Sequence, residues 1–258
     1  LVMESTYGDR LHEAPDQARE SLRQAARSTY DRGGKLLIPC FAVGRTQEIV
    51  YGLHQLWEES KLPQMDIFVD SPLAVNVTEV FRMHAEWFDS EILDLMLREH
   101  NRDPFGFGRL RYIRSVESSK ELNSLKQPAI IVSASGMCEA GRIRHHLKNH
   151  IGNPRNLVLF IGYCAENTLG AQILAGQKIV NIFGEPHAVR ARIASVDSFS
   201  GHADQGELLH YLKGITGQIR KIFVIHGEES QSLAFAEILR REKPGAEVIV
   251  PQPQQVVS

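Results

Sequence analysis

The sequence has few cysteines, no long apolar run and no excess of charge of either sign. Its three cysteines, Cys40, Cys138 and Cys164, are widely spaced and odd in number, which argues against a disulfide framework and favours a reducing compartment, so a cytoplasmic protein is expected. No apolar stretch approaches the length of a membrane span, and no membrane association is expected. Lysine and arginine number 29 against 31 acidic residues. Because nucleic-acid binders usually carry a basic surplus, binding to nucleic acid would require a local positive cleft.

The first residues also lack the features of a chain start. Leu1–Met3 reads as the end of a strand, with no signal peptide and no capped helix before it. We therefore expect the sequence to be part of something larger.

Strands and helices alternate along the sequence, without internal repeats or low-complexity tracts. The clearest helices and strands are predicted over Ala14–Arg32, Lys35–Cys40, Thr46–Glu59, Asp66–Asp70, Ala129–Ser133 and Asn156–Ile161, with a further strand over Ala188–Val196 and an irregular segment over Asn101–Arg114. This alternation predicts an α/β fold with mostly parallel sheets covered by helices. Ligands of such sheets bind at the loops that follow the carboxyl ends of the strands.

Two histidines stand in motifs that suit a catalytic site. His226 ends an apolar strand and is followed by Gly227, which leaves room for a close approach of backbone or ligand. That setting suits a metal ligand or an acid–base group, although a histidine bonded to a nearby carbonyl is the commoner arrangement. His202 lies in the turn Ser200–Asp204, where Asp204 can cap the following helix and Ser200 and Gly201 can hold a phosphate. An ordinary turn with a surface histidine is the alternative.

Other residues offer weaker signals for the same chemistry. Glu4 is predicted to lie in a strand, and a carboxylate beside an imidazole favours the imidazolium that a general acid needs. The small residues around Ser135 and Gly136, between a strand and a helix, suit a phosphate cradle. Arg45 and Ser71 follow strands in similar turns, and Arg45 offers a bidentate phosphate donor.

His146 and His150 share a helix face, as paired zinc ligands can. No third ligand and no HExxH pattern accompany them. A structural role is therefore favoured for this pair.

Taken together and in order, these motifs resemble the β-CASP branch of the metallo-β-lactamase superfamily, the zinc-dependent RNA-processing nucleases. The resemblance covers essentially the whole chain and is closest to the compact bacterial members. It is carried by the segments Glu4–Gly8, Phe41–Arg45, Asp70–Pro72, Ser118–Asn123, Ser133–Met137, Gly162–Gly170, Ser200–Asp204 and Phe223–Glu228.

The resemblance implies roles for particular residues. Glu4 matches the acidic residue of the first β-CASP motif, His202 the proposed acid for the leaving group, and His226 a histidine that completes the zinc site. Relatives hold RNA phosphates at the turns that match Ser135–Gly136 and Ser200–Ala203. We expect RNA in the cleft between domains, touched by a set of residues comprising Arg45, Ser71, Lys120, Ser135, Gly136, Ser200 and Gly201.

The resemblance also implies an α/β fold in which a doubly wound β-CASP domain is inserted into a metallo-β-lactamase αββα sandwich. Residues 1–8 correspond to the end of the first half of the lactamase-like domain, residues 9–183 to the β-CASP domain, and residues 184–258 to the carboxy-terminal part of the lactamase-like domain. The family's HxHxDH zinc motif does not occur in the sequence. We therefore expect the strands after Phe183 to lack partners and to expose an apolar face.

The favoured hypothesis is a fragment of a zinc-dependent ribonuclease that uses two zinc ions and is inactive by itself, because one imidazole cannot hold a catalytic zinc. The alternative is a non-catalytic RNA-binding or scaffold paralogue. A homo-oligomer is compatible with the sequence. A nucleotide-binding enzyme of the doubly wound class would show GxGxxG after the first strand, and no such motif occurs.

Overall fold

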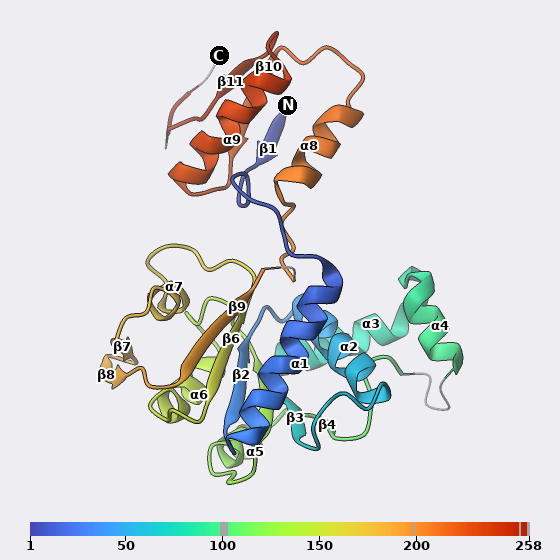
Figure 1. The fold of residues 1–258 in the computed structure, drawn as a ribbon, viewed down its shortest axis with the longest axis vertical. Coiled ribbons are helices and arrows are strands. Elements are labelled where there is room, and N and C mark those ends of the chain that lie inside the picture. Colours follow the sequence, from blue (N-terminus) through green and yellow to red (C-terminus); the bar gives the residue numbers. More distant parts are fainter. Residues whose placement is uncertain (99–102, 198, 253, 257–258) are drawn as a thin grey trace. The chain divides into compact units, whose positions relative to one another are not determined.

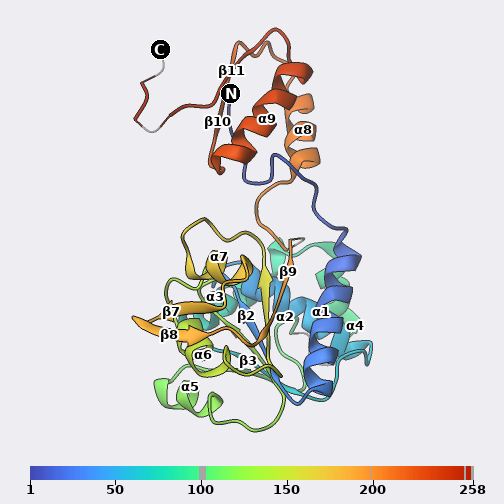
Figure 2. The same cartoon turned by 60° about the vertical axis from the view of Figure 1, so that its left-hand side comes forward.

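The computed structural model describes residues 1–98, 103–197, 199–252 and 254–256. The chain forms two compact units. The smaller unit consists of Leu1–His12 with Ser200–Ser258, and the larger unit of Glu13–Phe199 (Figures 1 and 2). Among the described helices, none combines the length and the apolar content that crossing a bilayer requires.

The larger unit is built on a sheet of six parallel strands in the order β4-β3-β5-β2-β6-β9, with an antiparallel β7–β8 hairpin beside it. In chain order its elements are α1 (Pro15–Asp31), β2 (Lys35–Pro39), α2 (Arg45–Glu58), β3 (Asp66–Val69), α3 (Pro72–Met83), η1 (Ala85–Trp87), α4 (Ser90–Arg98), β4 (Leu110–Tyr112), α5 (Val116–Leu122), β5 (Ala129–Ser133), α6 (Ile143–His150), β6 (Leu157–Ile161), α7 (Leu169–Leu174), β7 (Ile179–Ile182), β8 (Glu185–Ala188) and β9 (Arg192–Val196).

The central strands of this sheet are apolar along their whole length because both of their faces are buried. On β2, Leu36 and Ile38 join one core cluster, which includes Leu22 of α1 and Leu53 of α2. Leu37 points the other way into a second cluster with residues of α6 and α7. Helices therefore cover both faces of the sheet, as Figure 1 shows. The predicted α/β fold and the doubly wound domain are confirmed.

Three details differ from the sequence predictions. The segment expected to be irregular contains β4, which pairs with β3 through Ile67 and Leu110. The strand predicted over Ala188–Val196 is in fact the end of β8 followed by β9. All five residues of β9 pair with β6, and all four residues of β8 pair with β7. The later strands of the smaller unit are paired as well, so the expectation that strands after Phe183 lack partners is wrong. Because of the pairing of β8 and β9, residues 184–199 are grouped with the larger compact unit.

The smaller unit is a parallel three-stranded sheet in the order β1-β10-β11, packed on two helices. Its elements are β1 (Val2–Glu4), α8 (Gln205–Gly214), β10 (Lys221–Ile225), α9 (Glu229–Glu242) and β11 (Glu247–Ile249). Met3, Val224 and Phe235 lie in the core between sheet and helices.

The opposite face of this small sheet has no helix over it among the described residues. Val2 and Ile225, which alternate with the buried residues of their strands, are 60% and 41% exposed. Phe223, paired with Val2, is half-buried on the same face. An exposed apolar face was expected from the sequence, and the structure confirms it.

Candidate active site

Glu4 and His202 form the closest contact of the candidate site, within the smaller unit. Glu4 is the last residue of β1, where its backbone lies opposite Ile225 of β10. Its Oε2 is 2.7 Å from Nδ1 of His202, and its Oε1 accepts a hydrogen bond from the backbone N–H of Ala203 at 3.3 Å. The carboxylate thus orients both the ring and the turn that carries it, and Nε2 is the nitrogen through which His202 can act on a ligand.

The turn that holds His202 is fixed by the start of α8. Asp204 accepts the N–H of Glu207 at 2.8 Å, and the Glu207 carboxylate accepts the N–H of Asp204 at 3.0 Å, which makes a capping box. Asp204 also accepts the N–H of His12 at 2.9 Å. Burial by itself raises the pKa of Asp204, but these backbone hydrogen bonds outweigh it and lower the pKa. The carboxylates of Asp204 and Glu207, which lie near His12, therefore cap α8. The sequence predicted this role for Asp204.

His226 lies beside His202 at the end of β10. It adopts a left-handed backbone conformation, with φ of 54°. The Thr6 hydroxyl donates to its carbonyl at 2.9 Å and lies 3.3 Å from its Nδ1. Since the single hydroxyl proton goes to the carbonyl, the Thr6 oxygen accepts from Nδ1–H, which leaves the lone pair on Nε2 of His226. The His202 and His226 ring centroids are 5.0 Å apart.

Gly227 is required by close packing of the chain. A Cβ at this position would lie 2.5 Å from Oγ and 2.8 Å from the carbonyl oxygen of Ser5. We expect Gly227→Ala to destabilise the smaller unit by about 1–3 kcal/mol, because the strand ends must separate to admit the methyl group. The measurement is hydrogen–deuterium exchange of β1 and β10, which should become faster.

Gly217→Ala is the matched control, since nothing lies within 4 Å of a Cβ there. Exchange in β10 that is equally protected in both variants would contradict the packing assigned to Gly227.

The donor set around His226 fits part of a zinc site. Ligand atoms of Glu4, His202 and His226 all lie within 4.8 Å of one another. Glu4 and Nδ1 of His202 are hydrogen-bonded to each other, however, which leaves Nε2 of His202 and Nε2 of His226 as the two ring nitrogens open to a ligand. A catalytic zinc needs about three protein ligands. The described residues therefore do not make a complete site.

The loops at the carboxyl ends of β3 and β5 lie next to each other in the larger unit, because the Ser133 hydroxyl donates to the carbonyl of Asp70 at 2.7 Å. The Ser135 hydroxyl, half-buried, bonds to the main chain of Ala140. Ser71 is buried, and its hydroxyl caps α3 by accepting from the N–H of Ala74 at 3.3 Å. Ser71 therefore shapes the edge of the sheet and offers little surface to a ligand.

The remaining predicted RNA contacts are spread over both units. In the larger unit, Arg45 is ion-paired with Glu48 and its side chain is 13% exposed, while Lys120 is exposed on α5. In the smaller unit, the Ser200 hydroxyl accepts from the N–H of His202 at 3.2 Å, and Gly201 is exposed. Lys120 and Gly201 thus have open surface, whereas Arg45 must leave Glu48 to bind a phosphate.

A buried charged network under these loops was missed by the sequence reasoning. The fully buried Asp70 carboxylate lies 2.7 Å from Nη1 of Arg142, 2.7 Å from Nε2 of His146 and 2.6 Å from the hydroxyl of Ser119. Burial raises the pKa of Asp70, but hydrogen bonds from His146, Ser119 and Arg142 outweigh it and hold the pKa below its ordinary value. In the sequence, the one signal for this network is that Asp70 directly follows an apolar strand.

The network also explains the histidine pair of α6. Both ring nitrogens of His146 are engaged, Nε2 by Asp70 and Nδ1 by Asn123 at 3.0 Å. Burial and the charge of His146 lower the pKa of His150 to about 4. The structural role favoured by the sequence is therefore the one observed for His146.

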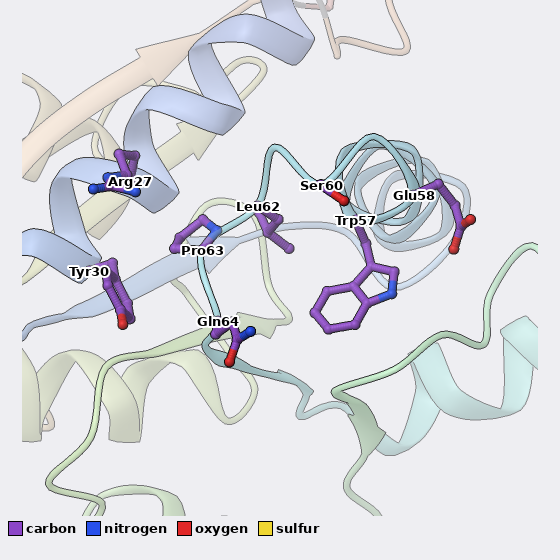
Figure 3. A pocket seen from close by; sticks show the side chains of 8 residues that line it. All are labelled: Arg27, Tyr30, Trp57, Glu58, Ser60, Leu62, Pro63 and Gln64. Carbon is purple, nitrogen blue, oxygen red and sulfur yellow. The ribbon is translucent and has the colours of Figure 1, made fainter.

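The hollow drawn in Figure 3 lies away from these loops. Arg27 and Tyr30 come from the end of α1, and Trp57 and Glu58 from the end of α2. Because each helix precedes a parallel strand, this hollow is at the amino end of the sheet, opposite to the edge that binds ligands in such folds.

Two family models match the chain. The Beta-Casp domain matches residues 46–173, and the Zn-dependent metallo-hydrolase RNA specificity domain matches residues 186–251. The chain therefore belongs to the β-CASP family, as the sequence motifs indicated.

Similarity to curated proteins supports this family membership. A ribonuclease of Thermus thermophilus is 37% identical over 239 residues, which is 93% of this chain and 54% of the relative. An RNase J-like protein of Methanocaldococcus jannaschii is 35% identical over 92% of this chain and 53% of its own length. Transcription termination factor FttA of the same organism is 31% identical over 93% of this chain and 39% of its length. The chain thus spans about half the length of the first two relatives and a smaller share, 39%, of the third.

Proposed function

We propose that these 258 residues belong to a zinc-dependent ribonuclease that hydrolyses RNA phosphodiester bonds in RNA processing or decay. The supporting observation is the 2.7 Å contact between Glu4 and His202, with the His226 ring alongside. Family membership and the ribonuclease relatives support the same reaction class.

In the proposed reaction a water oxygen bonds to phosphorus and gives up a proton to the solvent, while the bond to the leaving oxygen breaks. The leaving oxygen then needs a proton. Glu4 holds Nδ1 of His202 and stabilises the imidazolium, so that Nε2 can donate this proton. The imidazole of His202 regains its proton from water after the product departs. General acid catalysis of this kind contributes about 10²–10⁴ in rate.

We propose two zinc ions for the complete enzyme, with His226 as one ligand and the other ligands supplied from outside these residues. The bare apolar face around Val2 and Ile225 supports this, because an exposed face of this kind marks an interaction surface. RNA phosphates are proposed to contact the turns at Ser135–Gly136 and Ser200–Gly201, with Lys120 as a cation on α5.

The test measures zinc content and RNA cleavage of the purified 258-residue chain. We expect no RNA cleavage by this chain. A longer polypeptide that also contains the remaining zinc ligands should bind two zinc ions and cleave RNA. His226→Ala should then abolish zinc binding at one site, whereas His210→Ala, an exposed histidine of the same unit, should not. Zinc-dependent cleavage by the short chain that survives His226→Ala would contradict the proposal.

A non-catalytic RNA-binding or scaffold paralogue remains the second candidate function. It predicts RNA binding without cleavage even when all zinc ligands are supplied. The hydrogen-bonded Glu4 and His202 favour the enzyme, because RNA binding alone does not require an oriented imidazole.

We also propose a cytoplasmic location, supported by three cysteines that are all free within the described residues. Light scattering on the same preparation measures the oligomeric state.

A further inference from the structure

Phe41 is a half-exposed aromatic ring at the carboxyl end of β2, in the larger unit. The residue is 47% exposed. The Phe41 carbonyl accepts hydrogen bonds from the backbone N–H of Thr46 at 3.2 Å and from the Thr46 hydroxyl at 2.8 Å. The backbone that carries the ring is therefore fixed by the first turn of α2.

The ring rests against the turn at Gly136. A Cβ at position 136 would lie 3.2 Å from Cδ2 and Cε2 of Phe41. The ring is thus supported by the main chain next to Ser135, while about half of the residue is exposed to solvent. Phe41 and the Ser135 hydroxyl come from two neighbouring strands, since β2 pairs with β5.

A comparison with Phe183, the other strongly exposed phenylalanine among the described residues, shows why Phe41 stands apart. Phe183 is 42% exposed, but the Arg144 guanidinium lies over its ring at 4.4 Å and the His145 ring is 4.7 Å away. The face of the Phe183 ring is therefore already covered by the Arg144 guanidinium. Phe41 has no ring or cation partner of this kind in the described part of the chain.

An unoccupied ring at this position is chemically informative. Leaving half of a phenylalanine in water forgoes hydrophobic stabilisation, and it does so at the sheet edge where ligands of parallel sheets bind. An aromatic face beside a turn that can hold a phosphate is the combination that recognises single-stranded nucleic acid, because every unpaired base offers a π face.

We propose that Phe41 is a stacking platform for one base of single-stranded RNA. This rests on the proposed function, and it specifies the substrate: a base inside a duplex is covered by its neighbours and cannot stack on a side chain. The turn at Ser135–Gly136 holds the backbone of the same strand, and Phe41 holds a base without reading its identity.

The experiment measures binding of the chain to a single-stranded eight-nucleotide RNA and to an abasic ribose-phosphate strand of equal charge, with EDTA present to prevent cleavage. Phe41→Ala should weaken binding of the RNA roughly tenfold or more, and leave binding of the abasic strand unchanged. Phe41→Trp should restore RNA binding. Val43→Ala is the matched control, because Val43 is 63% exposed in the same loop and is not aromatic.

The outcomes separate this inference from the proposed function. If the parent chain binds RNA and Phe41→Ala binds it equally well, stacking on Phe41 is wrong while RNA binding stands. Equal losses for the RNA and the abasic strand mean that Phe41 shapes the loop and does not stack. If the parent chain binds neither strand, the RNA-binding proposal fails and this inference fails with it.

Discussion

Replacing Asp70 with alanine is expected to lower the free energy of unfolding of the larger unit by about 3–5 kcal/mol. Removing one partner of a buried ion pair leaves the other charge without compensation, and here Arg142 and the fully buried His146 both lose their carboxylate. The measurement is urea unfolding followed by tryptophan fluorescence. Both tryptophans of the chain, Trp57 and Trp87, lie in the larger unit, so the signal reports on it alone.

The matched control is Asp31→Ala, which removes an aspartate from a solvent-exposed pair with Arg27 in the same unit. Exposed pairs contribute little, so its unfolding midpoint should stay close to that of the parent chain. Equal midpoints for the Asp70 and Asp31 variants would show that the buried network does not stabilise the unit.

The pH dependence gives a second readout for Asp70. Its pKa is lower in the folded chain than its ordinary value, so its stabilising contribution is complete above the unfolded pKa of about 4 and is lost as pH falls through the folded pKa. The stability difference between the parent chain and Asp70→Ala should therefore be constant near neutral pH and shrink below about pH 4.

Replacing His202 with alanine is expected to lower kcat for RNA cleavage by about 10²–10⁴, the usual contribution of a general acid. The assay uses a polypeptide that contains these residues together with the remaining zinc ligands. Because His202 is assigned to proton donation, zinc content should stay unchanged. Glu4→Gln should lower kcat as well, since the amide keeps the size of the side chain but stabilises the imidazolium less.

His210→Ala is again the control, and its rate should match the parent enzyme. Loss of zinc from the His202 variant would contradict the assignment, because Glu4, His202 and His226 are close enough to share a metal ion. His202 would then be a ligand, and the proton donor would have to be sought elsewhere.

The candidate catalytic residues could be predicted from the sequence because the order of several motifs resembles the β-CASP family. The local signals alone, an apolar strand before His226 and a turn of small residues around His202, left a structural role open for each histidine. The short strand β4 was missed because it has three residues in a segment rich in glycine. Its pairing with β3 depends on a contact with residues more than 40 positions away.

The sequence by itself determined the α/β class, the family and the three residues of the candidate site, since periodicity and motif order are local properties of the chain. Only the tertiary structure decided which polar groups are committed elsewhere. It placed Ser71 in a helix cap, paired Arg45 with Glu48, and buried Asp70 between Arg142 and His146. Such partners are brought together by packing of distant segments, and a hydrogen bond to one group removes that group from binding another.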